Sequence, residues 1–163
     1  MTKELLSNIA ELAENFVANR KSMHVATVDI TGFPLASYTP FYRDASSHFH
    51  ILVSDLSSHT KNLLAGKANI LLIEDESECK QIYARTRLNF PCTVLHEKRG
   101  TEQYAKIIKH LHHRHGEVIS TISELADFRL LKLTPSQGVF VRGFGQAYTI
   151  DPMLTTVVPI MPG

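Results

Sequence analysis

The feature that most constrains the fold of this chain is a strand–helix–strand pattern between Phe49 and Asp75. Residues 49–53 and 69–73 are short runs rich in β-branched and aliphatic side chains, which predicts two strands. The polar segment between them carries two leucines and is closed by Gly66, a residue type that commonly ends helices. We therefore expect a short helix between two strands, with the rest of the chain arranged around this unit.

The N-terminus of this short helix is a candidate anion site. Ser57 or Ser58 is a suitable N-cap, and free backbone N–H groups in the first turn favour a phosphate or carboxylate. The first turn would then contain His59, Thr60, Lys61 and Asn62. A connecting helix that the serines merely cap, with Lys61 in solvent, gives the same pattern, so the segment by itself leaves both interpretations open.

The segment before this unit predicts a helix followed by closely connected strands. Apolar residues at helical spacing indicate an amphipathic helix over residues 3–19. Residues 23–30 and 34–42 alternate with a period of two around a Thr-Gly turn, which predicts a hairpin. A polar turn at residues 44–47 leads into the next strand, so we expect three strands in meander order.

The second half of the chain adds helices and further strands. The patterns predict an extended segment over 81–96, helices over 101–115 and 117–125, and strands over 128–133, 139–142 and 144–150. Six or more antiparallel strands with a few helices argue for an α+β fold rather than a parallel sheet. We expect one domain over residues 1–163, built as an antiparallel six-stranded β-barrel, closed or partly closed, with flanking helices.

Composition narrows the classes of partner. The formal net charge is +1 and no basic stripe is present, so nucleic-acid binding is not expected. No apolar stretch approaches the length of a membrane span and no export signal is recognisable, so we expect a cytoplasmic protein without a membrane partner. Cys79 and Cys92 lack metal-site spacing, and we expect two free thiols.

Two groups of side chains invite a chemical interpretation. The histidines His110, His112, His113 and His115 lie at helical spacing, but no carboxylate stands at the companion position of a metalloprotease motif, and we predict no metal site. Arg85 and Arg87 would share a strand face and, with Lys61, could bind phosphate or propionate groups. A solvated sheet face with acidic neighbours explains these cations equally well.

Several motifs together resemble one known superfamily. They are ATVDITGFPLASYTPF, SDLSSHTKNL followed by ILLIEDE, ARTRLNF, and GVFVRGFGQAY. This combination, which spans nearly the whole chain, resembles the pyridoxamine 5′-phosphate oxidase-like, FMN-binding split-barrel superfamily, and within it the haem-utilisation proteins of the HugZ/HutZ type. The resemblance implies a homodimeric split barrel whose cofactor lies between the subunits.

The resemblance implies two ligands, FMN or haem. In flavin-binding relatives the FMN phosphate lies at the segment that corresponds here to Ser54, Ser58, His59, Thr60, Lys61 and Asn62. His59 and Thr60 replace the arginine-lysine pair of the true oxidases. In haem-utilisation relatives basic residues of the strand that carries Arg85 and Arg87 lie near the porphyrin, and an acidic residue matched by Asp127 could orient an axial histidine.

The axial ligand itself is not found at its usual place. Those relatives carry a histidine near the C-terminus, whereas the sequence given ends at Pro162-Gly163, so a bound iron would need another ligand. The leading expectation is a haem-utilisation protein that binds haem at a dimer interface and could degrade it. The alternatives are an FMN-binding oxidoreductase and a non-catalytic protein that stores haem or flavin.

Overall fold

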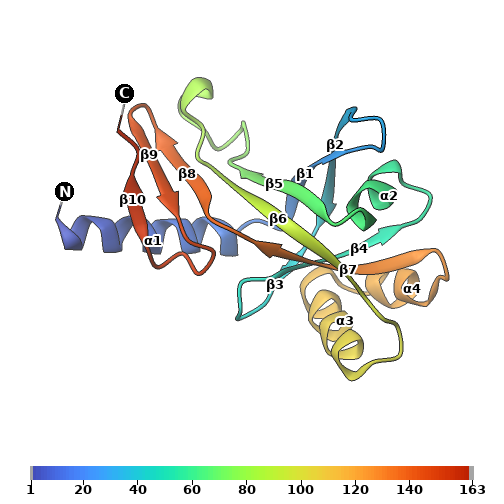
Figure 1. Ribbon diagram of the computed structural model, residues 1–163. Helices are drawn as coiled ribbons and strands as arrows, with labels where there is room; N and C mark the ends of the chain where they lie inside the picture. Colours follow the sequence, from blue (N-terminus) through green and yellow to red (C-terminus); the bar gives the residue numbers. More distant parts are fainter. Residues whose placement is uncertain (1, 162–163) are drawn as a thin grey trace.

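A computed structural model describes residues 2–161 of the chain as ten strands and four helices (Figure 1). The helices are α1 (Lys3–Ala18), α2 (Ser58–Leu64), α3 (Glu102–His115) and α4 (Val118–Glu124), with a 3-10 turn η1 (Ile82–Ala84). The strands are β1 (Ser22–Val28), β2 (Pro34–Pro40), β3 (Tyr42–Arg43), β4 (Phe49–Ser54), β5 (Lys67–Ile73), β6 (Arg87–Glu97), β7 (Phe128–Pro135), β8 (Gly138–Gly143), β9 (Gln146–Ile150) and β10 (Val157–Pro159). The prediction about an axial ligand concerned the C-terminal residues Pro162-Gly163, which lie outside the described residues.

The sheet forks at β6, its longest strand. One edge of β6 pairs with β5, and that path runs on through β1 to β2. The other edge pairs first with β8, over residues 87–89, and then with β7, over residues 92–97. The fork falls at Pro91, which has no N–H to donate, and the Pro91 carbonyl accepts a hydrogen bond from the Ser136 N–H at 2.8 Å. The curled, branched sheet that results confirms the α+β split-barrel class.

The predicted strand order needs one correction. The expected three-stranded meander is wrong, because the chain leaves the β1–β2 hairpin at Phe41 and only the two-residue β3 pairs with β4. The main partner of β4 is β7, from the far end of the chain. The strands β4 and β5 on either side of the short helix form as predicted and are not neighbours in the sheet, because α2 carries the chain across to another part of it. Strand β10 was not predicted, and the strand count exceeds six.

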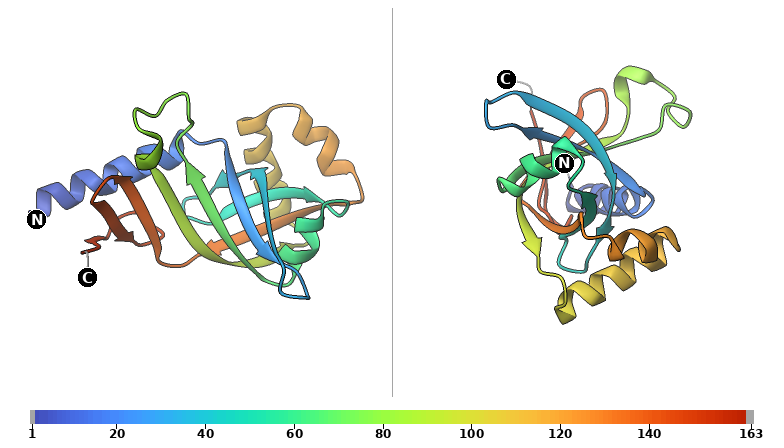
Figure 2. Two further views of the ribbon diagram at one scale, coloured as in Figure 1. Left: turned by 90° about the horizontal axis from the view of Figure 1, so that it is seen from above. Right: turned by 90° about the vertical axis from the view of Figure 1, so that its right-hand side faces the viewer.

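Two apolar clusters hold the sheet and helices together. The larger lies inside the curl, where Phe41, Phe49, Phe90 and Phe140 are buried together with the inner face of α1. The smaller lies on the other side of β4 and β7, where α3 and α4 pack on Leu52 and Leu130. Figures 1 and 2 show the consequence: α1 lies along the β8–β10 end of the molecule, and α3 and α4 cover the β4–β7 end.

The start of β8 packs tightly against β6, which yields a test of the fork. A Cβ atom added at Gly138 would lie 2.2 Å from the Asn89 carbonyl oxygen and 2.3 Å from the Phe90 ring, whereas one added at Gly143 meets nothing within 4 Å. We expect Gly138→Ala to lower the free energy of unfolding by about 1–3 kcal/mol or more, because backbone must move. Urea unfolding measures this, and Gly143→Ala is the matched control. Equal stability of the two variants would contradict the close approach at the fork.

Candidate functional site

A mainly apolar hollow lies on the outer face of the sheet, where β1, β2, β5, β6 and β8 run side by side. Its volume is about 640 Å³. The residues that line it are His24, Val25, Ala26, Ala36, Asn69, Leu71, Arg87, Asn89, Val139 and Val141. We call this hollow the sheet groove. Its size falls within the range of small-molecule and cofactor sites.

Strand alternation explains how the sequence makes the groove. In β1 the side chains of Met23, Val25 and Thr27 are buried, so His24 and Ala26 face outward. The strand register pairs Ala26 with both Ala36 and Asn69, and their short side chains leave the surface hollow. The groove is therefore apolar along its floor and carries few polar groups.

Arg87 is the one arginine of the predicted pair that lines the groove. It opens β6, and its Nη1 donates to the Arg85 carbonyl at 3.1 Å. Arg85 precedes the strand, so the alternation that was expected to place both side chains on one face does not apply to it. Its Nε donates to the Glu74 carbonyl at 2.9 Å, and Nη1 contacts the Glu76 carboxylate at 3.2 Å. Only Arg87 of the two has its side chain at the groove.

The first turn of α2 is largely engaged in holding the helix on the sheet. The Thr60 N–H donates to the Ser57 carbonyl at 3.0 Å, and the Thr60 hydroxyl donates to the Ser54 carbonyl at 2.6 Å. The Asn62 amide donates to Thr27 Oγ1 at 3.1 Å, on the inner face of the β1–β2 hairpin. The Ser57 side chain makes no capping bond. Fewer first-turn donors are free for an anion than the sequence suggested.

The side chain of His59 points to the inner face of the β1–β2 hairpin, where its surroundings determine the tautomer and the protonation state of the ring. Its Nδ1 lies 2.8 Å from Ser37 Oγ, and that hydroxyl donates its own hydrogen to the Val25 carbonyl. The imidazole must therefore donate from Nδ1–H, which leaves the lone pair on Nε2. Burial lowers the pKa of His59 below its ordinary value, so the ring is neutral at pH 7.

The remaining predicted residues fall into two places. Ser58, Lys61 and Asn62 line a smaller hollow of about 350 Å³ beside the tip of the β1–β2 hairpin, and the carboxylate of Asp29 lines it too. Ser54 and Asp127, which lie far apart in the sequence, are joined directly: Ser54 Oγ donates to Asp127 Oδ2 at 2.6 Å. None of these residues lines the sheet groove.

Comparison with known proteins identifies the family. Residues 9–142 match the pyridoxamine 5′-phosphate oxidase family. The chain belongs to this family. It is 41% identical over 139 residues to the haem oxygenase HutZ of Vibrio cholerae serotype O1, a match that covers 85% of this chain and 78% of the relative.

Two solved structures extend the likeness to the fold. The crystal structure of HutZ from Vibrio cholerae, described as a haem storage protein, superposes with a TM-score of 0.78 at 38% identity. The match covers 84% of this chain and 96% of the HutZ chain. Campylobacter jejuni ChuZ superposes with a TM-score of 0.85 at 29% identity. That match covers 94% of this chain and 63% of the ChuZ chain. The resemblance that the motifs indicated is confirmed.

None of the helices in residues 2–161 has both the length and the apolar composition of a membrane span.

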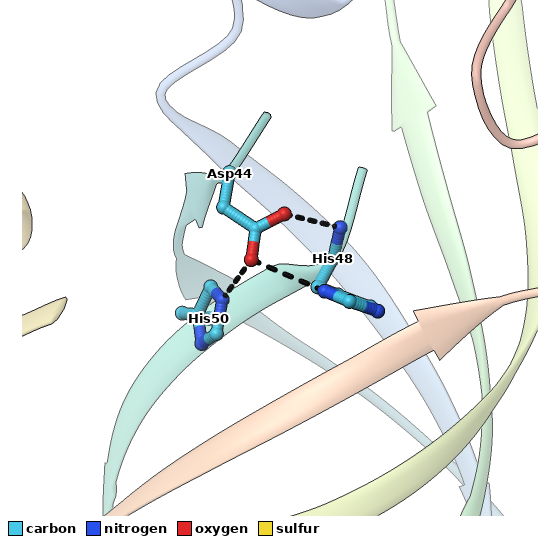
Figure 3. Close-up of side chains that lie close together, drawn as sticks. All are labelled: Asp44, His48 and His50. Carbon is cyan, nitrogen blue, oxygen red and sulfur yellow. Dashed lines mark hydrogen bonds and ion pairs between the residues drawn. The ribbon is translucent and has the colours of Figure 1, made fainter. Parts of the chain in front are cut away.

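This member of the pyridoxamine 5′-phosphate oxidase family also carries a polar cluster that the sequence analysis missed. Asp44, His48 and His50 come together at the β3–β4 turn (Figure 3). The signal was present as an Asp-x3-His-x-His spacing, which keeps the three side chains within one short segment around a turn.

The histidines of α3 that were considered as metal ligands have separate partners and do not point to a common site. The His115 Nε2 lies 2.9 Å from the Phe41 carbonyl, and the His112 Nε2 lies 3.2 Å from Glu117. The His110 ring stacks on Tyr42, with the ring centroids 4.7 Å apart.

The neutral state of His59 predicts a dependence of stability on pH. The unfolded chain takes up a proton on this ring below about pH 6.5, whereas the folded protein resists protonation there, so stability falls as the pH falls through that value. We expect His59→Asn, which can still donate to Ser37, to lose less stability between about pH 7.5 and pH 5.5 than the wild type. Denaturant unfolding at both pH values gives the comparison. Identical losses in the two proteins would contradict a depressed pKa at His59.

Proposed function

We propose that this protein binds haem in the sheet groove and serves in haem utilisation. The observation that carries the proposal is the position of Arg87 beside a mainly apolar hollow of about 640 Å³. Haem is a flat, mainly apolar molecule with two propionates, and a guanidinium fork matches such carboxylates. The 41% identity to HutZ, a protein named as a haem oxygenase, supports this ligand over other flat aromatic compounds.

Haem iron is commonly held by an axial histidine, and one histidine of this chain lies at the groove. His24 lines the groove, and the register places it opposite Leu71 in the same row of side chains as Asn89. His59 is the less suitable histidine, because it bonds to Ser37 on the inner face of the hairpin while the groove opens on the outer face. We propose His24 as the side chain of this chain best placed to ligate the iron.

A second copy of the chain would complete the proposed site. The outer sheet face leaves apolar side chains in water around the groove, including Tyr38 at 68% and Val28 at 55% exposure. A homodimer formed over this face would bury those side chains and enclose a porphyrin between subunits. It could also bring the Ser54–Asp127 pair of one subunit towards the groove of the other, as an orienting group for an axial ligand.

The competing flavin function has weaker support from the described residues. The FMN phosphate would lie near Ser58 and Lys61, but the N–H and hydroxyl of Thr60 are already bonded and the carboxylate of Asp29 lines the same hollow. The negative charge of Asp29 repels a phosphate in this hollow and offsets the attraction of Lys61. Titration with haem and with FMN, followed by absorption, decides between the two. Tight FMN binding without haem binding would overturn the proposal.

The contact between Arg87 and a propionate can be tested directly. We expect Arg87→Ala to weaken haem binding by roughly 10-fold or more, since hydrogen bonds to charged groups contribute about 1.5–3 kcal/mol. Arg142→Ala, on the neighbouring strand β8 and outside the groove lining, is the control. With a porphyrin dimethyl ester, which has no propionate charge, the variant and the wild type should bind alike. An unchanged haem affinity in Arg87→Ala would remove this contact.

The proposed dimer is tested by placing a charge on the groove floor. Leu71 lies half-buried on the outer face of β5. We expect Leu71→Asp to convert a dimer into a monomer in sedimentation experiments, because a carboxylate cannot be buried unpaired in an apolar interface. Far-ultraviolet circular dichroism should stay unchanged. A wild-type protein that is monomeric at every accessible concentration would rule out haem binding between subunits.

Turnover separates an oxygenase from a storage protein. The sequence relative HutZ is called a haem oxygenase, whereas the crystal structure of HutZ is described as that of a haem storage protein. Incubation of the haem complex with a reductant in air distinguishes the two roles for this chain. Loss of the Soret band with release of iron indicates breakdown, whereas a stable spectrum indicates storage.

A further inference from the structure

We propose that Asp44, His48 and His50 form a binding site for one divalent transition-metal ion, with Zn²⁺ as the reference ion. The three residues meet at the turn between β3 and β4, beside α3, and none of them lines the sheet groove. The site is therefore separate from the proposed haem site and does not depend on it. Figure 3 shows the Asp44 carboxylate lying between the two imidazole rings.

The distances suit a common ligand. Asp44 Oδ2 lies 2.8 Å from His50 Nε2 and 3.1 Å from His48 Nδ1, and the three atoms lie within 4.8 Å of one another. In a tetrahedral zinc site with bonds of about 2.0–2.1 Å, neighbouring ligand atoms are roughly 3.3 Å apart. Small rotations of the side chains would therefore be enough to place all three atoms around one ion.

The carboxylate is already held in position by the turn. Asp44 Oδ1 accepts the N–H groups of Ser46 and His48, both at 2.9 Å. These bonds account for the part that aspartate commonly has in such turns. They do not account for Oδ2, which faces both imidazoles. Oδ2 lies within hydrogen-bond distance of both rings, so the turn gathers one carboxylate oxygen and two imidazole nitrogens at one point, as a metal site requires.

His50 is the buried anchor of the cluster. Its side chain is fully buried in β4, and its ring stacks with Tyr42 at a centroid distance of 6.0 Å. Its Nε2 lies 2.8 Å from Asp44 Oδ2, so Nε2 carries the ring proton when no ion is bound. Binding an ion at Nε2 then requires only that the ring proton move to Nδ1. Within residues 2–161 the Nδ1 atom is buried without a hydrogen-bond partner, and we expect an affinity about 10- to 100-fold below that of sites whose histidines have an orienting partner.

The donor set selects the kind of ion. Two imidazoles and one carboxylate favour Zn²⁺, Fe²⁺, Ni²⁺ or Cu²⁺ over Mg²⁺ and Ca²⁺, which prefer oxygen ligands. Three protein ligands leave at least one coordination position open. Asp44 and His48 both line a hollow of about 520 Å³, so water or a small anion could occupy that position. Lys106 and Lys132 line the same hollow, which favours an anion there.

Titration of the haem-free full chain with Zn²⁺, followed by calorimetry, tests the site. We expect one ion per chain, no binding of Mg²⁺, and visible absorption bands of tetrahedral type when Co²⁺ is used. His48→Ala and Asp44→Asn should each weaken Zn²⁺ binding by at least about 100-fold, because loss of an outer partner alone costs 10- to 100-fold. Asp44→Asn keeps an oxygen that can accept the two turn N–H groups, so the fold should persist.

His112→Ala is the matched control, since it removes a histidine of α3 outside the cluster. Zn²⁺ should raise the melting temperature of the wild type and of His112→Ala but not that of His48→Ala. Retention of wild-type affinity in His48→Ala and Asp44→Asn would overturn the proposal. Loss of binding in His112→Ala would overturn it too, because the ion would then lie on α3.

Discussion

The forked pairing of β6 is the constraint on which the rest of the structure depends. One strand joins β5 on one edge and both β8 and β7 on the other. The β5 path gives the curl its outer face, where the groove forms, and the β7 path brings in β4 and the helices α3 and α4. Two residues make the fork possible. Pro91 has no N–H to donate to a neighbouring strand, and Gly138 has no side chain, which lets β8 approach β6 closely.

The fork also separates two chemical environments. On the outer face, small side chains on paired strands leave an apolar hollow with a single arginine at its side, which suits a flat ligand with acidic groups. At the β3–β4 turn, a carboxylate fixed by backbone N–H groups faces two imidazoles, which suits a metal ion. These sites differ because one is built by the register of paired strands, whereas the other is built by the turn at residues 44–48 and the start of β4.

The candidate residues show how tertiary packing changes the role of a motif. Arg85 and Arg87 are two residues apart, yet one guanidinium is tied to Glu74 and Glu76 while the other lines the groove, because β6 begins between them. In the HTKN motif, Thr60 and Asn62 hold α2 on the sheet, and only part of the motif reaches the hollow beside the hairpin tip. A motif thus contains residues for packing as well as residues for a ligand.

The sequence by itself determined the helices, most of the strands, the α+β class and the family, because periodicity and turn residues act over short distances and the motifs are specific. It could not determine that β4 pairs with β7 or that Ser54 donates a hydrogen bond to Asp127. Nor could it determine that Arg87 lines the groove while Arg85 binds the Glu74 carbonyl instead. Those pairings join segments more than seventy residues apart or depend on where a strand starts. The Asp44 cluster was within reach as a local spacing, but only the folded turn shows that both imidazoles face one carboxylate oxygen.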